Sequence, residues 1–284
     1  MLLCQNFRLL LKGVFWEGAT SMQDIIDFHA HIFPEKIVDK ATTNIGAFYD
    51  IPMHVNGRVT ALLEEGEKAG IHRFVVQSVA TKPDQVHSIN CFIAQQCELH
   101  PELIGLGTLH PRMEDWEEEI QHIKQLGLKG VKLHPDFQKF QLDDPMVFPI
   151  YAKLEGNLPL LIHTGDPRYD FSHPRRMANV LDKFPALDVV AAHLGGWMQW
   201  KESERWLLPR RVWVDTSSSY GFMEPEEYRR LIKAFGPDRC LFGTDFPMWQ
   251  HEPSLRHLRA VGLPEEDMAK ILSGNAKRVL GLAD

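Results

Sequence analysis

Eight short apolar runs recur along the chain, and they constrain the fold more than any other feature of the sequence. Most of them are continuous rather than alternating, which is typical of strands buried on both faces of a parallel sheet. The runs cover residues 24–29, 73–79, 103–109, 130–134, 158–163, 188–193, 212–216 and 240–245. Eight parallel strands are the number that closes a barrel in which each strand is followed by a helix.

The segments between these runs have helical spacing and helix-ending residues. Helices are predicted at residues 58–69, 83–100, 113–126 and 225–235, with a last helix at 264–282. Glycine commonly follows the end of a helix, and Gly70, Gly127 and Gly236 do so here. The repeated alternation predicts an α/β protein with a (β/α)8 TIM barrel. A doubly wound open sheet is the alternative, but no glycine-rich phosphate-binding loop follows an early strand.

The chain length limits the number of domains. The 284 residues are close to the roughly 250 that are typical of one TIM barrel, so we expect a single catalytic domain over residues 22–284. Residues 1–21 are expected to be an extension, such as a tag remnant or a misplaced start. Their apolar stretch is broken by Arg8 and Lys12, which argues against a signal peptide or a membrane span. Residues 32–56 exceed a usual strand-to-helix connection and are expected to fold over the barrel mouth.

Charge and cysteine content exclude several classes of protein. A net charge of −7 provides no basic stripe for nucleic acid and no polybasic segment for a membrane surface. The four cysteines include no C-x-x-C pair, so neither a disulfide framework nor a structural zinc finger is indicated. We therefore expect a cytoplasmic protein with a small-molecule substrate. A homodimer would suit such a barrel, although no stripe of the sequence demonstrates it.

Histidines concentrate at the carboxyl ends of the predicted strands, where TIM barrels carry their chemistry. If the strand ends comprise about eight sites of about four residues, chance would put only about two of the histidines there. Six of the 14 histidines occupy such positions: His29, His31, His110, His134, His163 and His193. This excess predicts an active site. The histidines elsewhere, including His87, His122 and His251, carry no functional prediction.

The strand-end residues have the chemistry of a metal site. Side chains two apart on a strand point the same way, so His29 and His31 both face the mouth when Ala30 faces the helices. Asp245 ends the last run and supplies a carboxylate, which would be costly at the top of an apolar barrel without a cation nearby. Neutral imidazoles with one carboxylate are the ligands expected for zinc or a similar first-row ion.

Four strand-end motifs occur in the order Asp27-Phe-His-Ala-His31, His163-Thr-Gly165, Ala192-His-Leu-Gly-Gly196 and Gly243-Thr-Asp-Phe-Pro247, and the last predicted helix contains Gly274-Asn-Ala-Lys-Arg-Val-Leu-Gly281. Together they resemble the amidohydrolase superfamily, and within it the amidohydrolase-2 branch that includes the aminocarboxymuconate semialdehyde and resorcylate decarboxylases. The resemblance extends from about Asp24 to Leu282. It implies a barrel of the metal-dependent hydrolase type.

The resemblance also implies a set of metal ligands, namely His29, His31, His163 and Asp245. His193 would be either a catalytic acid/base or a ligand of a second ion. Members with two ions bridge them through a carboxylated lysine on the fourth strand, where this chain has Lys132. We expect Lys132 to lie too deep to bridge, with a buried ion pair as its alternative role, and therefore favour one divalent ion, zinc.

Two kinds of reaction remain open for such a centre. A metal-activated water, with Asp245 binding the ion and accepting a proton, would hydrolyse an amide, lactone or ester. The alternative is a lyase, a decarboxylase or hydratase acting on a small carboxylic acid, in which His193 would protonate the carbon that loses CO2. We place hydrolysis first, because no motif identifies the aromatic or muconate acid of the known lyases.

Substrate contacts are predicted at His134 and Arg168. The Arg168 guanidinium would bind a carboxylate or phosphate through two hydrogen bonds, or would instead be bonded to Asp170 within its loop. His134, His110 and Asp215 would act in the site or support its ligands. Two other classes stay open: a barrel that binds a ligand or metal without catalysis, and a phosphate-binding metabolic barrel.

Overall fold

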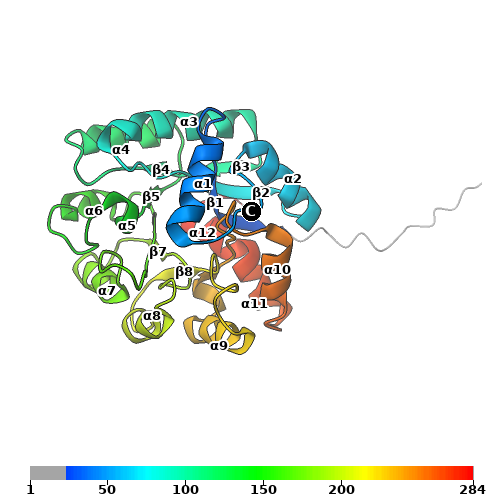
Figure 1. Ribbon diagram of the computed structural model, residues 1–284. Helices are drawn as coiled ribbons and strands as arrows, with labels where there is room; N and C mark the ends of the chain where they lie inside the picture. The colour runs from blue at the N-terminus through cyan, green and yellow to red at the C-terminus, as the bar shows by residue number, and fades with distance from the viewer. Residues whose placement is uncertain (1–23, 284) are drawn as a thin grey trace, which may run out of the picture.

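Each of the eight predicted runs contains a strand, and the computed structural model, which describes residues 24–283, assembles them into one closed barrel (Figure 1). All pairings are parallel and follow chain order. The strands are β1 (Ile26–His31), β2 (Arg73–Gln77), β3 (Leu103–Gly105), β4 (Gly107–Thr108), β5 (Val131–Leu133), β6 (Leu160–Ile162), β7 (Val189–Ala191), β8 (Trp213–Asp215) and β9 (Cys240–Leu241). The predicted TIM barrel is confirmed.

One interruption explains why the structure has nine strands for eight barrel positions. β3 pairs with β2, and β4 pairs with β5. Only Leu106 separates β3 from β4, so these two strands together occupy the third position of the barrel. The barrel closes between its first and last strands. The amide of Phe28 donates to the carbonyl of Phe242 over 2.8 Å, and the amide of Asp245 donates to the carbonyl of His29 over 2.8 Å.

Most strands are apolar on both faces because they contact two separate cores. One core fills the barrel interior and receives Ala276 and Leu280 from the last helix; its residues in or next to the strands are Ile26, Phe28, Val75, Leu106, Leu161, Val190, Ala192 and Leu241. The other core packs the outer strand faces, such as Phe74 and Ile162, against the surrounding helices. Continuous apolar runs are therefore required here.

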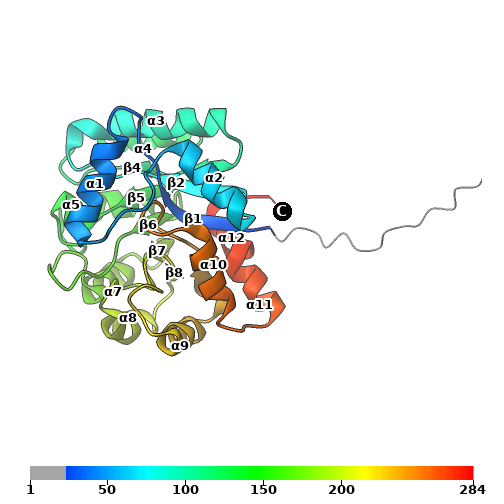
Figure 2. The same ribbon diagram turned by 45° about the vertical axis from the view of Figure 1, so that its right-hand side comes forward.

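Helices surround the barrel in chain order (Figures 1 and 2). The helices and helical turns are α1 (Val38–Tyr49), α2 (Val59–Ala69), η1 (Pro83–Gln85), α3 (Val86–Leu99), α4 (Trp116–Gln125), α5 (Pro135–Gln138), α6 (Phe148–Leu154), α7 (Pro174–Lys183), α8 (Trp200–Leu207), α9 (Pro225–Phe235), η2 (Pro237–Arg239), α10 (His251–Arg259), α11 (Glu265–Ala269), η3 (Lys270–Gly274) and α12 (Asn275–Leu280). The predicted helices agree with α2, α3, α4 and α9. The last predicted helix comprises three consecutive pieces, the middle one a π-helix.

The long segment after β1 covers the mouth, as its length predicted. It contains α1, which lies across the barrel in Figure 1. Ile45 and Tyr49 of α1 line the same cavity as His29 and His193 at the strand ends. α1 thus closes the end of the barrel at which the polar strand-end residues gather.

The predicted N-terminal extension and its boundary with the barrel are not tested by the structure. The predicted extension at residues 1–21 lies outside the described residues, and the domain boundary at residue 22 stays a prediction. Within residues 24–283, none of the helices combines the length and the apolar character that crossing a bilayer would require.

Candidate active site

Three predicted metal ligands converge at the mouth of the barrel. The Nε2 atoms of His29 and His31 are 3.3 Å apart, and each lies close to Oδ1 of Asp245, at 3.4 Å from His29 and 3.3 Å from His31. Ligand atoms about 2.0–2.1 Å from a zinc ion stand roughly 3.3–3.4 Å from one another at tetrahedral angles. The triangle therefore has the dimensions of one face of a tetrahedral metal site, and its two imidazoles and one carboxylate fit such an ion.

A buried carboxylate fixes the ring of His29. The Nδ1 of His29 lies 2.9 Å from Oδ2 of Asp215, so Nδ1–H donates to the carboxylate and Nε2 keeps its lone pair. Asp215 is itself held by the amides of His193 at 3.1 Å and Ser217 at 3.0 Å. Burial alone would raise the pKa of Asp215, but the adjacent His29 and these hydrogen bonds keep it well below its usual value. Such carboxylate–imidazole pairs support metal ligands in many proteins.

The other two ligands are also prepared for a cation. Burial lowers the pKa of His31 to about 4, so its imidazole is neutral, the form that binds metals. The free oxygen of Asp245, Oδ2, accepts a hydrogen bond of 2.6 Å from Ser218 Oγ, which also accepts from Trp249 Nε1 at 2.9 Å. Asp245 and Ser218 both have positive φ, 67° and 45°, an uncommon conformation for residues other than glycine that is often found at functional sites.

Lys132 lies nearer to this triangle than the sequence indicated. Its Nζ is 3.0 Å from Nε2 of His29, so the amino group reaches the ligand group, and the expectation that Lys132 lies too deep to bridge two ions stays a prediction. The side chain is buried, and burial lowers its pKa to about 8, although the neighbouring Asp245 and Asp215 act in the opposite direction. Lys132 therefore brings a buried amino group to the floor of the site.

His163 and His193 form a second pair in the same cavity. The Nδ1 of His163 faces the Nε2 of His193 at 2.9 Å, and Nε2 of His163 lies 2.8 Å from the carbonyl of Gly165. The Nε2–H of His163 donates to that carbonyl, which leaves Nδ1 as the ring's lone pair. His163 is not part of the His29–His31–Asp245 triangle, but His163 and His193 line the same cavity as the triangle.

The cavity has a volume of about 650 Å³. Its polar lining at the strand ends includes His29, His31, Lys132, His163, His193 and Asp245. Its walls are mostly apolar and include Phe33, Ile45, Phe48, Ile89, Phe92 and Met248. A cavity of this size accepts a small molecule whose polar end contacts the floor and whose apolar body contacts the walls.

The two predicted substrate ligands occupy different surroundings. His134 lines the cavity, and its Nε2 is 2.8 Å from the hydroxyl of Tyr49. Arg168 is not among the cavity-lining residues; its guanidinium pairs with Asp166, rather than with Asp170, at 2.9 and 2.7 Å. Arg168 also donates to the carbonyl of Phe48 and so connects the loop after β6 to α1. Its role as a substrate ligand stays a prediction.

Sequence reasoning included Asp215, which supports His29, but missed Tyr49, Ser217 and Ser218. Tyr49 comes from α1, and no spacing pattern points to it. Ser217 and Ser218 lie shortly after β8, so their strand-end position was the available signal, but serines are too common to single out. His110, also a strand-end histidine, is buried and accepts a hydrogen bond from the amide of Arg112, and it does not line the cavity.

The glycine of the His163-Thr-Gly165 motif is required by its surroundings. Gly165 has φ +86°, and a Cβ there would lie 2.4 Å from the amide nitrogen of Trp197. We expect Gly165→Ala to lower the free energy of unfolding by about 2–4 kcal/mol, because backbone strain and a backbone clash add. Gly156 is the matched control: its φ is +68° but no atom lies within 4 Å, so Gly156→Ala should cost only about 1 kcal/mol. Equal losses in urea unfolding would contradict the steric argument.

Comparison with known proteins identifies relatives of the chain. A 2-amino-3-carboxymuconate-6-semialdehyde decarboxylase from Dictyostelium discoideum is 25% identical over 246 residues, which cover 70% of this chain and 67% of that protein. A 6-methylsalicylic acid decarboxylase from Penicillium expansum is 23% identical over 321 aligned positions, which cover 91% of this chain and 98% of that protein.

Solved structures share the fold. A dihydroxybenzoic acid decarboxylase from a Polaromonas species, crystallised with manganese and the inhibitor 2-nitroresorcinol, superimposes with a TM-score of 0.71 at 16% identity, covering 92% of this chain and 97% of that one. The sequence model of the family described as Amidohydrolase matches residues 26–282. The chain therefore belongs to the amidohydrolase family, in the amidohydrolase-2 branch that its motifs resemble.

Proposed function

We propose that this protein is a metal-dependent decarboxylase that acts on a small aromatic or unsaturated carboxylic acid. The sequence analysis placed hydrolysis first, but both curated relatives are named as decarboxylases, which favours the alternative. The observation that carries the proposal is the cavity of about 650 Å³, which is lined by aromatic and aliphatic side chains together with histidines, Lys132 and Asp245. Such a cavity suits a flat apolar ring that bears a carboxylate at one end.

The metal would be held by His29, His31 and Asp245, with Nδ1 of His163 as the further ligand. A bound divalent ion supplies positive charge that attracts the substrate carboxylate and stabilises negative charge developing on the substrate. Zinc fits this donor set, and manganese is the second candidate because the Polaromonas relative contains it. We favour one ion per chain; a second would use His193 and Lys132.

The protein side chains have separate tasks in this reaction. Lys132 extends its amino group beside His29 and would attract the acid to the floor. Phe48 and Phe92 would sandwich the ring and exclude water from it. When the bond between the ring carbon and the carboxylate breaks, its electron pair stays on the carbon and CO2 leaves. His193 would then give a proton to that carbon, so that one proton replaces each CO2 released.

The test compares substrates and two histidine variants. The metal-loaded protein is incubated with a panel of hydroxybenzoic and unsaturated acids, and in parallel with lactones and amides, while CO2 release and product are followed by gas analysis and NMR. We expect decarboxylation of at least one acid. In His193→Asn, kcat should fall by about 10²–10⁴-fold, the usual contribution of a general acid.

His110→Asn is the matched control for that variant. His110 is also a buried strand-end histidine but does not line the cavity, so its replacement should leave kcat nearly unchanged. Turnover of lactones or amides without decarboxylation of any acid would overturn the proposal and restore the hydrolase interpretation.

A further inference from the structure

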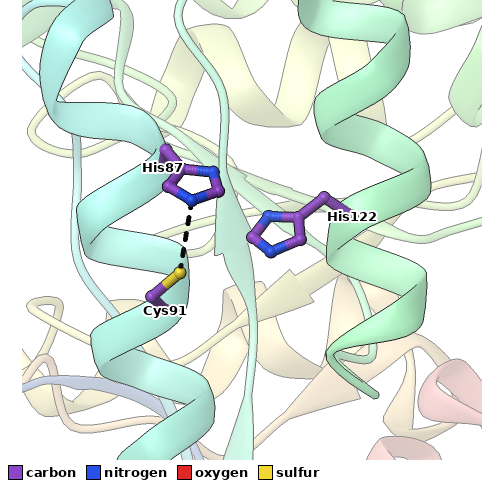
Figure 3. Close-up of side chains that lie close together, drawn as sticks. All are labelled: His87, Cys91 and His122. Carbon is purple, nitrogen blue, oxygen red and sulfur yellow. Dashed lines mark hydrogen bonds between the residues drawn. The ribbon is translucent and has the colours of Figure 1, made fainter.

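A group of potential ligands lies on the outer helices, away from the barrel mouth. His87 and Cys91 are one turn apart on α3, and His122 faces them from α4 (Figure 3). The Nε2 of His87 is 3.7 Å from Sγ of Cys91, and the rings of His87 and His122 stack with centroids 4.4 Å apart. One ligand atom from each of the three residues lies within 4.8 Å of the others. None of the three lines the active-site cavity.

A single buried carboxylate orients both imidazoles. Glu119 Oε2 is 3.2 Å from Nδ1 of His87, and its Oε1 is 3.0 Å from Nδ1 of His122. Glu119 is buried, its two oxygens each face one imidazole, and Asn90 donates to one of them, so the carboxylate is placed as the common acceptor. Both Nδ1–H groups therefore donate to Glu119, which leaves both Nε2 atoms as the lone pairs available to a ligand.

Glu119 is in turn fixed to the barrel. Its Oε1 accepts a hydrogen bond of 2.7 Å from Asn90 Nδ2, and Asn90 also bonds to the carbonyl and the amide of Thr108 in β4, at 3.0 and 2.7 Å. A carboxylate held by the scaffold behind two histidines is the arrangement that supports metal-bound imidazoles elsewhere. Two imidazoles that share one such support, with a thiol 3.7 Å from one of them, are more than a chance surface cluster.

We propose that His87, Cys91 and His122 bind one zinc ion on the outer face of the barrel, separate from the ion at its mouth. A tetrahedral zinc ion with one nitrogen and one sulfur ligand holds them roughly 3.5–3.6 Å apart, close to the 3.7 Å between His87 and Cys91. His122 completes the set by a small rotation of its half-buried ring, and water takes the fourth position. The thiol loses its proton on binding.

Helix α3 connects the proposed zinc site to the active-site cavity. Ser88, Ile89 and Phe92 of α3 line the active-site cavity, and His87 and Cys91 alternate with them along the same helix. An ion that connects α3 to α4 would fix the helix that forms one wall of the cavity. This structural role does not depend on which reaction the barrel mouth performs.

Cobalt(II) distinguishes the two centres, because the ligand group at the mouth contains no cysteine. Titration of the metal-free full-length protein with cobalt should produce a thiolate-to-cobalt absorption band in the near ultraviolet that reports one of the about two cobalt ions bound per chain. The band should disappear in Cys91→Ser and weaken at least tenfold in apparent affinity in His122→Ala. Added zinc should abolish it in the wild type.

Cys97→Ser is the matched control. Cys97 is on the same helix, but its side chain is half-buried and outside the cluster, and burial raises its pKa to about 11. The variant should keep the band in full. A wild-type protein that binds cobalt at the mouth without any thiolate band, or a band that survives in Cys91→Ser, would overturn the proposal without affecting the proposed decarboxylase.

Discussion

Asp245→Asn is expected to lose the metal at the mouth and to lower the proposed decarboxylase activity by a factor on the order of 10³. The substitution removes the negative charge that faces His29 and His31 at 3.4 and 3.3 Å, and an amide is a poor substitute for a carboxylate ligand. Elemental analysis of protein purified without added metal gives the first readout, and kcat/KM after metal loading gives the second.

Substitutions at two other carboxylates provide a comparison for the metal content of Asp245→Asn. Asp215→Asn keeps all the ligands but loses the acceptor that orients His29, so metal affinity should fall by about 10–100-fold rather than vanish. Asp182→Asn changes an exposed carboxylate paired with Arg210 and should leave metal content unchanged. Full metal content and activity in Asp245→Asn would exclude the triangle as the metal site.

Asp27→Ala should cause the largest loss of stability, about 3–5 kcal/mol. Asp27 is fully buried and accepts hydrogen bonds from the amide of His29 at 3.0 Å and from the amide and hydroxyl of Thr244 at 3.0 and 2.6 Å. The ring nitrogen Nε2 of His251 lies 3.0 Å from its second oxygen. Alanine would leave these buried donors without an acceptor, and the connection between β1 and the segment after β9 would be lost.

Asp24 provides the comparison within the same part of the chain. It is partly exposed and pairs with Lys277 over 3.0 Å, so Asp24→Ala should cost less than about 1 kcal/mol. Urea unfolding of the two variants, followed by circular dichroism, measures the difference. If Asp27→Ala unfolds at the same urea concentration as Asp24→Ala, the network around Asp27 does not hold the barrel closed.

The sequence predicted the barrel well because its signal repeats. Each strand is apolar on both faces, and the helices between strands end at glycines with positive φ such as Gly70 and Gly236, so local patterns and architecture agree. The family resemblance, confirmed by the match over residues 26–282, then assigned the motifs to successive strand ends. The convergence of His29, His31 and Asp245 follows from that order, whereas zinc as the metal, the homodimer and the cytoplasmic location stay predictions.

Side-chain partners could not be predicted in the same way, because they depend on distances across the barrel. A long flexible side chain allowed Lys132 to reach His29 from a position that looked too deep. Arg168 and Asp166 are two residues apart, but the Arg168 guanidinium also donates to the carbonyl of Phe48 on α1, a contact that sequence spacing does not reveal. The cysteine count, taken alone, gave no hint of the His87–Cys91–His122 group, since the i, i+4 spacing of two members acquires meaning only when α4 brings the third.

The His29–His31–Asp245 triangle combines residues that are far apart in the sequence. His29 belongs to β1 and Asp245 follows β9, and the adjacent hydrogen bond from Thr244 to Asp27 spans 217 positions of sequence. Contacts of such separation form late in folding, because the intervening chain must be ordered first. A nascent chain still lacking β9 would hold its first two histidines without their carboxylate. An ion bound at the proposed site would therefore require a completed barrel, and its binding would in turn stabilise the contact between β1 and the segment after β9.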